Sequence, residues 1–136
     1  MDRILLDTGP LVAVLSPSDT WHAACVEVWK TLTPPFYTCW PVLTETAWLL
    51  RSRPAAVERL LRSAPSGLLR ILPLAEEDGP PIASILKRYD NLRPQLADAA
   101  LVHLARREGF DTVLTLDQRD FRVYRAAGNR AFTILP

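Results

Sequence analysis

Four acidic side chains occupy positions where a folded domain usually places apolar residues. Asp7 directly follows the apolar run Ile4–Leu6, and Asp117 directly follows the run Val113–Leu116; both runs are typical of buried strands. A carboxylate near a core is costly unless something compensates its charge, so acids at such positions indicate chemistry rather than solubility. Parallel sheets bind their ligands at the carboxyl ends of the strands, which is where these two acids stand.

Two further acids lie on predicted helices. Glu45 precedes Trp48 and Leu49 by three and four residues, so we expect it to continue a buried helical face. Asp98 has a similar relation to the apolar positions of residues 101–105 and stands near a predicted helix start. Each of the four acids therefore combines a charged group with an apolar setting.

The expected meeting point of these acids predicts a metal-dependent reaction. In a parallel sheet, strand ends and the helix starts that follow them lie at one edge, so all four acids can share a pocket. At an effective dielectric of about 20 and separations near 5 Å, each ionised pair repels by roughly 3 kcal/mol. A divalent cation relieves this repulsion, and oxygen ligands favour Mg²⁺ or Mn²⁺ over Zn²⁺. Because such an ion activates water and stabilises charge on a phosphoryl oxygen, we expect phosphodiester hydrolysis.

The elements that must position these acids alternate along the chain. Strands are predicted at residues 4–6, 36–40, 69–72, 112–116 and 132–135, the first of them ending in a turn at 7–10. Helices are predicted at residues 20–32, 42–51, from 54 to the turn at 65–67, 76–89 and 96–107, with a turn or short helix at 118–124. This order favours an α/β fold: a three-layer α/β/α sandwich around a central, mostly parallel sheet of four or five strands.

Composition limits the class of protein. The 136 residues are 49% hydrophobic and 23% charged, which is typical of a soluble globular chain, and we expect one domain over residues 1–136. The apolar stretches are far shorter than the roughly 18 residues of a membrane-spanning helix, and the N-terminus lacks the apolar run of a secretory signal. We therefore expect a cytoplasmic protein without a membrane partner. Cys25 and Cys39 show no metal-binding spacing and are expected to be buried thiols.

Charge gives a local signal only. The net charge is +1, so no overall field points to a polyanionic partner. Arginines are concentrated in two regions, and the candidates for contact with a phosphate backbone are Arg51, Arg53, Arg119 and Arg122. A plain solvated surface explains the same arginines equally well, and both interpretations stay open.

Four segments of the chain resemble known motifs in their order and spacing. They are Leu5–Leu11, Val42–Ala47, Ala97–Val102 and Thr115–Phe121, and together they are similar to the PIN domain, in particular to the VapC toxins of toxin–antitoxin pairs. This resemblance implies a PIN-like fold and a metal-dependent endoribonuclease with Mg²⁺ or Mn²⁺ as its cofactor. It also implies an RNA substrate, a homodimer and silencing by a cognate VapB-like antitoxin.

Matching by motif also implies roles for individual residues. The resemblance makes Asp7, Glu45, Asp98 and Asp117 the catalytic, metal-binding quartet, Asp120 an outer ligand, and Thr8 and Thr115 hydroxyl partners of ligands or water. Relatives often place another aspartate three residues before the helical one, and here that residue is Gln95. This departure favours a single resident ion, or a second one that binds only with substrate. The alternative function is a degenerate PIN domain that binds protein or RNA without cleavage.

Simpler interpretations compete at several positions. Asp7 can cap the turn after its strand, and Asp120 either binds metal or only caps the turn that follows it. His103 is expected to be an ordinary helix histidine. The four tryptophans, at positions 21, 29, 40 and 48, are expected mainly in the core, with one or two available for a dimer face or an antitoxin helix.

Overall fold

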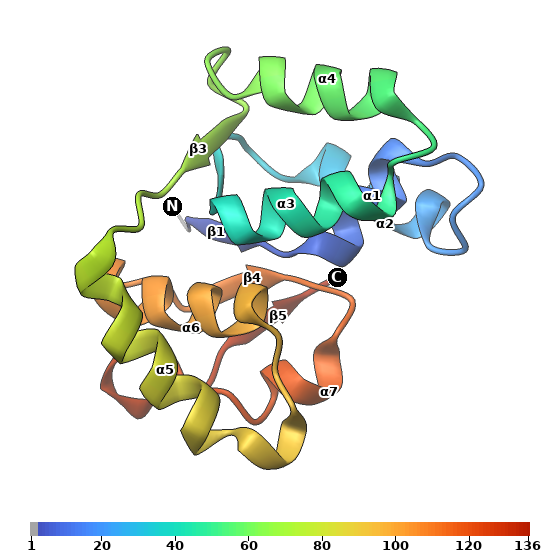
Figure 1. The fold of residues 1–136 in the computed structure, drawn as a ribbon. Coiled ribbons are helices and arrows are strands. Elements are labelled where there is room, and N and C mark those ends of the chain that lie inside the picture. The colour runs from blue at the N-terminus through green and yellow to red at the C-terminus, as the bar shows by residue number, and fades with distance from the viewer. Residues whose placement is uncertain (1–2) are drawn as a thin grey trace.

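The computed structural model describes residues 3–136 and contains a sheet flanked by helices (Figure 1). The strands are β1 (Ile4–Leu6), β2 (Phe36–Thr38), β3 (Leu69–Ile71), β4 (Thr112–Leu114) and β5 (Thr133–Leu135). The α-helices are α1 (Thr8–Leu15), α2 (His22–Thr31), α3 (Trp40–Leu49), α4 (Pro54–Ser63), α5 (Gly79–Arg88), α6 (Leu96–Glu108) and α7 (Gln118–Phe121), and the short 3-10 helices are η1 (Glu76–Asp78), η2 (Asp90–Leu92) and η3 (Ala127–Asn129). The five strands follow the order β3-β2-β1-β4-β5, and every pair is parallel, which confirms the predicted α/β fold.

The central strand β1 places the first acid. Leu5 pairs with Tyr37 of β2 on one side and with Val113 of β4 on the other, and all three residues of β1 are buried. Strands covered on both faces need apolar side chains at every position, which explains the continuous apolar run before Asp7. The carboxyl ends of β1 and β4 therefore lie side by side.

The segment after β1 differs from the prediction, because residues 8–15 form helix α1 rather than a turn. Asp7 is its N-cap and accepts a hydrogen bond from the Thr8 backbone N–H. Pro10 lies in the first helical turn, where the backbone N–H that it lacks would have no helical partner. Leu11 and Ala13 are buried and give the helix its packing face.

The environment of α3 also corrects the sequence analysis. The helix buries Val42, Leu43 and Thr46, whereas Trp48 and Leu49 are 64% and 49% exposed. Glu45 therefore does not continue a core-facing stripe. The prediction for the tryptophans is wrong for three of the four, since Trp21 and Trp40 are 54% and 55% exposed and Trp48 is exposed as well. The face of α3 that carries Trp40 and Trp48 therefore points toward solvent.

Helix α6 is the most deeply buried helix in the described part of the chain. Its residues 99–105 are all buried, as the apolar stripe after Asp98 predicted, and Gly109 ends it in a left-handed conformation with φ 78°. Cys25 and Cys39 are buried free thiols, as expected. Within residues 3–136, no helix combines the length and the apolar character needed to cross a bilayer.

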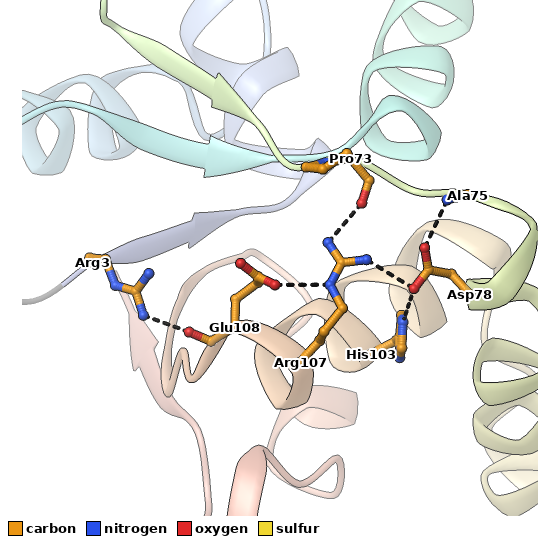
Figure 2. Close-up of polar contacts among 7 residues, drawn as sticks. All are labelled: Arg3, Pro73, Ala75, Asp78, His103, Arg107 and Glu108. Carbon is orange, nitrogen blue, oxygen red and sulfur yellow. Dashed lines mark hydrogen bonds and ion pairs between the residues drawn. The ribbon is translucent and has the colours of Figure 1, made fainter.

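A buried carboxylate joins α6 to the segment that follows β3 (Figure 2). Asp78 accepts hydrogen bonds from Ala75 N–H at 2.7 Å, from His103 Nε2 at 2.7 Å and from Arg107 Nη1 at 2.9 Å. Arg107 Nη2 also donates to the carbonyl of Pro73 at 2.7 Å. The backbone donor, followed by His103 and Arg107, holds the pKa of Asp78 well below its usual range. His103 is thus a structural helix histidine, as expected.

We predict that Asp78→Asn lowers the melting temperature by roughly 5 °C or more at neutral pH. An asparagine amide carries no charge and keeps only one acceptor oxygen. Either Ala75 N–H, which binds Oδ2, or both His103 and Arg107, which bind Oδ1, therefore lose their partner. Thermal unfolding followed by circular dichroism measures the change. Glu77→Gln, at the exposed neighbouring position, is the matched control and should leave the melting temperature unchanged. Equal melting curves for the two variants would contradict a stabilising role for this contact.

Candidate functional site

The carboxyl ends of β1 and β4 hold two of the predicted acids. Asp7 follows β1, donates its backbone N–H to the Leu114 carbonyl at 3.0 Å and is only 6% exposed. Asp117 follows β4 by three residues and is the N-cap of α7, where its carboxylate accepts from Asp120 N–H at 3.3 Å. The pairing of the strands therefore brings together two acids that lie more than a hundred residues apart in the sequence.

Thr115 connects these two acids. Its hydroxyl donates to Asp7 Oδ2 at 2.7 Å and accepts from the Asp117 backbone N–H at 3.0 Å. Thr115 is fully buried, so this geometry is fixed by packing as well as by hydrogen bonds. Thr115 fixes the orientation of the Asp7 carboxylate and the start of the Asp117 loop.

The other two acids come from helices. Asp98 is the third residue of α6, and its Oδ2 accepts from the Gln95 backbone N–H at 3.0 Å, an arrangement that closes the helix start. Glu45 lies in the middle of α3, which packs against α6. The same two helices therefore bring Glu45 toward Asp98.

All five predicted acids border one open cavity of about 540 Å³. Its lining consists of Asp7, Glu45, Asp98, Asp117 and Asp120, together with Thr8, Gly9, Leu49, Arg93, Gln95 and Leu116. We call this cavity the acid cavity. Arg93 is the one basic residue in its lining, so the acids greatly outnumber the cations there. The expected convergence of the acids is observed.

The acids affect one another's protonation. Burial is the main cause that raises the pKa of Asp7, Glu45, Asp98 and Asp117 above the ordinary range. Burial, followed by the charge of Asp7, raises the pKa of Asp98 to about 6. The charge of Asp98 in turn raises the pKa of Glu45, and the charges of Glu45 and Asp117 raise that of Asp7. These mutual effects agree with the shared lining of the acid cavity, because charges raise one another's pKa only at short range.

The donor set of the acid cavity fits a hard divalent cation. Every anionic group is a carboxylate, and the cavity lining holds no histidine or cysteine. The Thr8 hydroxyl is buried without a hydrogen-bond partner, although it lies near enough to Glu45 to lower the pKa of that acid in part. An unpaired buried oxygen beside carboxylates is the kind of group that an ion or its water satisfies.

Within residues 3–136, no three histidine, cysteine, aspartate or glutamate side chains already have the geometry of a metal site. Side-chain adjustment would therefore accompany metal binding.

The arginines proposed from sequence lie outside the lining of the acid cavity. Arg51 stacks on Trp48, with its Cζ 4.1 Å from the ring centroid, and Arg53 and Arg122 are exposed. Arg119 is exposed too, but it lies near enough to Asp117 for its charge to lower the pKa of that acid in part. Contact of these arginines with phosphate stays a prediction.

Sequence reasoning missed Arg93, which borders the acid cavity. Arg93 follows η2 and adopts a left-handed backbone with φ 51°. The only signal was its position in the polar, proline-containing segment before α6. Outside a helical or strand pattern, the sequence does not predict where a side chain points. A left-handed backbone conformation is also uncommon for arginine.

Known proteins resemble this chain over nearly its whole length. The family model of the PIN domain matches residues 4–127, a range that includes all five acids. Ribonuclease VapC26 of Mycobacterium tuberculosis (strain ATCC 25618 / H37Rv) is 30% identical over 135 residues, which cover 98% of this chain and 100% of VapC26. The crystal structure of M. tuberculosis VapC20, a Sarcin-Ricin loop cleaving toxin, matches with a TM-score of 0.74 and 22% identity, over 81% of this chain and 86% of VapC20. The likeness to VapC20 supports the observed fold.

Proposed function

Because the chain belongs to the PIN domain family, we propose that it is a VapC-like endoribonuclease that hydrolyses RNA phosphodiester bonds with bound Mg²⁺ or Mn²⁺. The observation that carries the proposal is the acid cavity, where five carboxylates meet a single lining arginine. A cavity of this charge repels RNA unless a cation offsets it. The family match and the electrostatics therefore favour the same chemistry.

Each residue of the site has a defined part in this proposal. Asp7, Glu45, Asp98 and Asp117 would hold the ion, and Asp120 at the cavity edge would act as an outer ligand. When bound, the ion supplies a water of lowered pKa and stabilises negative charge on a phosphoryl oxygen. Thr115 keeps the Asp7 carboxylate in place through its 2.7 Å hydrogen bond.

Further polar residues would complete the site. Arg93 would contact a non-bridging oxygen of the RNA phosphate, because it borders the cavity and a guanidinium pairs well with phosphate. The unpaired Thr8 hydroxyl oxygen would bind the ion or a water molecule. Gln95 borders the cavity and contributes an amide in place of a carboxylate, so we propose one resident ion rather than two.

The proposal extends to partners and location. The similarity to VapC26, a ribonuclease, supports an RNA substrate. From the resemblance to VapC toxins we also propose a cognate VapB-like antitoxin, a homodimer and a cytoplasmic location, where RNA is available. Arg51, Arg53, Arg119 and Arg122 remain proposed contacts for the RNA backbone. The comparisons give no support to a degenerate domain that binds without cleaving, and no acid of the proposed quartet has been replaced.

A cleavage assay tests this function directly. We expect the purified protein to cut 5′-labelled structured RNA in the presence of Mn²⁺ or Mg²⁺, and excess EDTA to abolish cleavage because no other group in the cavity replaces the ion. Added Mn²⁺ should restore activity, which distinguishes metal removal from damage to the protein. Cleavage that continues in EDTA would contradict the metal requirement, and Mn²⁺ binding without cleavage of any RNA would contradict the enzymatic function.

A further inference from the structure

A second cavity lies near the other end of α6, and we propose that it binds a backbone phosphate of the RNA substrate away from the cleaved bond. It has a volume of about 280 Å³ and is lined by Arg88, Arg106, Ala126, Ala127, Gly128 and Asn129. We call it the arginine cavity. The inference rests on the proposed function and adds to it a second contact for the same RNA.

The charges in the arginine cavity have no carboxylate partner. Within residues 3–136, the ion pairs involve other cations, and the cavity lining contains no acid. Arg106 is half-buried, with Nε donating to the Arg125 carbonyl at 3.1 Å and Nη2 to the Tyr89 hydroxyl at 3.4 Å. These neutral acceptors position the guanidinium but leave its positive charge uncompensated. A partly desolvated cation of this kind gains from an anionic ligand.

Tyr89 brings the two arginines together. Its hydroxyl accepts from Arg106, and the Cζ atom of Arg88 lies 5.5 Å from the centroid of its ring. Tyr89 is itself buried and packs edge-on against Tyr124, with ring centroids 5.0 Å apart. The guanidinium groups are thus held by a rigid aromatic support. Each planar guanidinium group held in this way can donate two hydrogen bonds to a phosphate.

The loop of the arginine cavity adds a concave backbone. Gly128 and Asn129 both have positive φ, at 66° and 60°, so the chain curves sharply between α7 and β5. Sharp left-handed turns form concavities in which backbone N–H groups bind anions. A Cβ atom added at Gly128 would have no heavy atom within 4 Å, so this side of the loop is open to a ligand.

The acid cavity and the arginine cavity are both lined by residues of α6. Asp98 and Arg106 lie eight residues apart on α6, which corresponds to about 12 Å along the helix axis at 1.5 Å per residue. A stacked strand rises by about 3.4 Å per nucleotide, so roughly four nucleotides cover this distance. An RNA of about 12 nucleotides is therefore long enough to cover this distance along α6.

Equilibrium binding of RNA tests the inference without cleavage. Fluorescence anisotropy in EDTA would measure the affinity of the full chain for a labelled single strand of about 12 nucleotides. We expect Arg88→Gln to weaken binding of this RNA about fivefold and to reduce the slope of log K against log salt by about 0.7.

Lys87→Gln is the matched control, because Lys87 is exposed next to Arg88 and lies outside the cavity lining. It removes the same charge and should change neither quantity appreciably. A second variant, Arg106→Lys, keeps the charge but loses the planar guanidinium, and should also weaken binding of this RNA. Equal effects of Arg88→Gln and Lys87→Gln, or no effect of Arg88→Gln, would overturn the inference. If the wild-type protein cleaves RNA but the Arg88→Gln variant binds RNA with wild-type affinity, the proposed second contact is wrong and the proposed function still stands.

Discussion

Asp98→Asn is expected to reduce RNA cleavage at least a hundredfold without lowering the stability of the protein. Asp98 borders the acid cavity, and its charge would be one of those that hold the ion. The asparagine side chain has nearly the same shape, and its amide oxygen can still accept from the Gln95 backbone N–H. Removal of one repelling charge favours the empty folded state, because burial and the charge of Asp7 already raise the pKa of Asp98 to about 6.

The measurement combines initial cleavage rates at saturating Mn²⁺ with thermal unfolding of the metal-free protein. Asp90→Asn is a suitable control, since Asp90 is exposed, precedes the same helix and lies outside the acid-cavity lining. Asp7→Asn should abolish cleavage too, although Asp7 also caps α1 and accepts from Thr115. An Asp98→Asn variant with cleavage within threefold of wild type would refute the role proposed for this acid.

The placement of the acids was predictable wherever local pattern and topology determine it. Asp7 ends a continuous apolar strand, and Asp98 begins an apolar helical stripe whose residues are all buried. Parallel pairing of β1 with β4 then brings Asp7 and Asp117 to the same edge of the sheet. Their convergence followed from the alternation of strands and helices, because connections in such folds return each strand to the same direction.

The formation of α1 and the buried face of α3 depend on tertiary packing, which a short sequence window does not reveal. The segment Thr8–Leu15 has only two helical turns and holds Gly9 and Pro10, so its helix depends on the Asp7 cap and on packing. Trp48 follows Glu45 at helical spacing, yet the buried face of α3 is the one with Val42 and Thr46. A helix that carries large apolar residues on two faces does not reveal which face meets the core.

The metal-free protein is expected to lose stability as the pH rises from about 4 to 7. The folded-state pKa of Asp98 is raised from its ordinary value of 3.8 to about 6, so between these values the folded state binds more protons than the unfolded state. By linkage, the free energy of unfolding then falls as the pH increases. The Asp98 contribution is about 1–2 kcal/mol after allowance for solvent screening at this partly exposed carboxylate. The raised pKa values of Asp7, Glu45 and Asp117 act in the same direction.

Urea unfolding at several pH values, in EDTA, measures this dependence. Asp78 contributes with the opposite sign, because its depressed pKa gives stability that is lost only as the pH falls below about 4, outside this window. Asp98→Asn should flatten the curve between pH 4 and 7, whereas Asp90→Asn should reproduce the wild-type slope. A metal-free stability that rises with pH across this range would contradict the electrostatic account of the acid cavity.

Mn²⁺ should reverse the sign of this slope. The ion binds the deprotonated carboxylates, so its contribution to stability grows as the pH rises through the raised pKa of Asp98 near 6. At a Mn²⁺ concentration a hundred times the dissociation constant, binding adds about 2.7 kcal/mol, which exceeds the contribution of about 1–2 kcal/mol that Asp98 makes to the opposite slope. The wild-type protein should therefore be least stable at pH 7 without the ion and most stable at pH 7 with it. In Asp98→Asn both dependences should shrink together, because the carboxylate that is destabilised in the empty cavity is the one proposed to bind the metal.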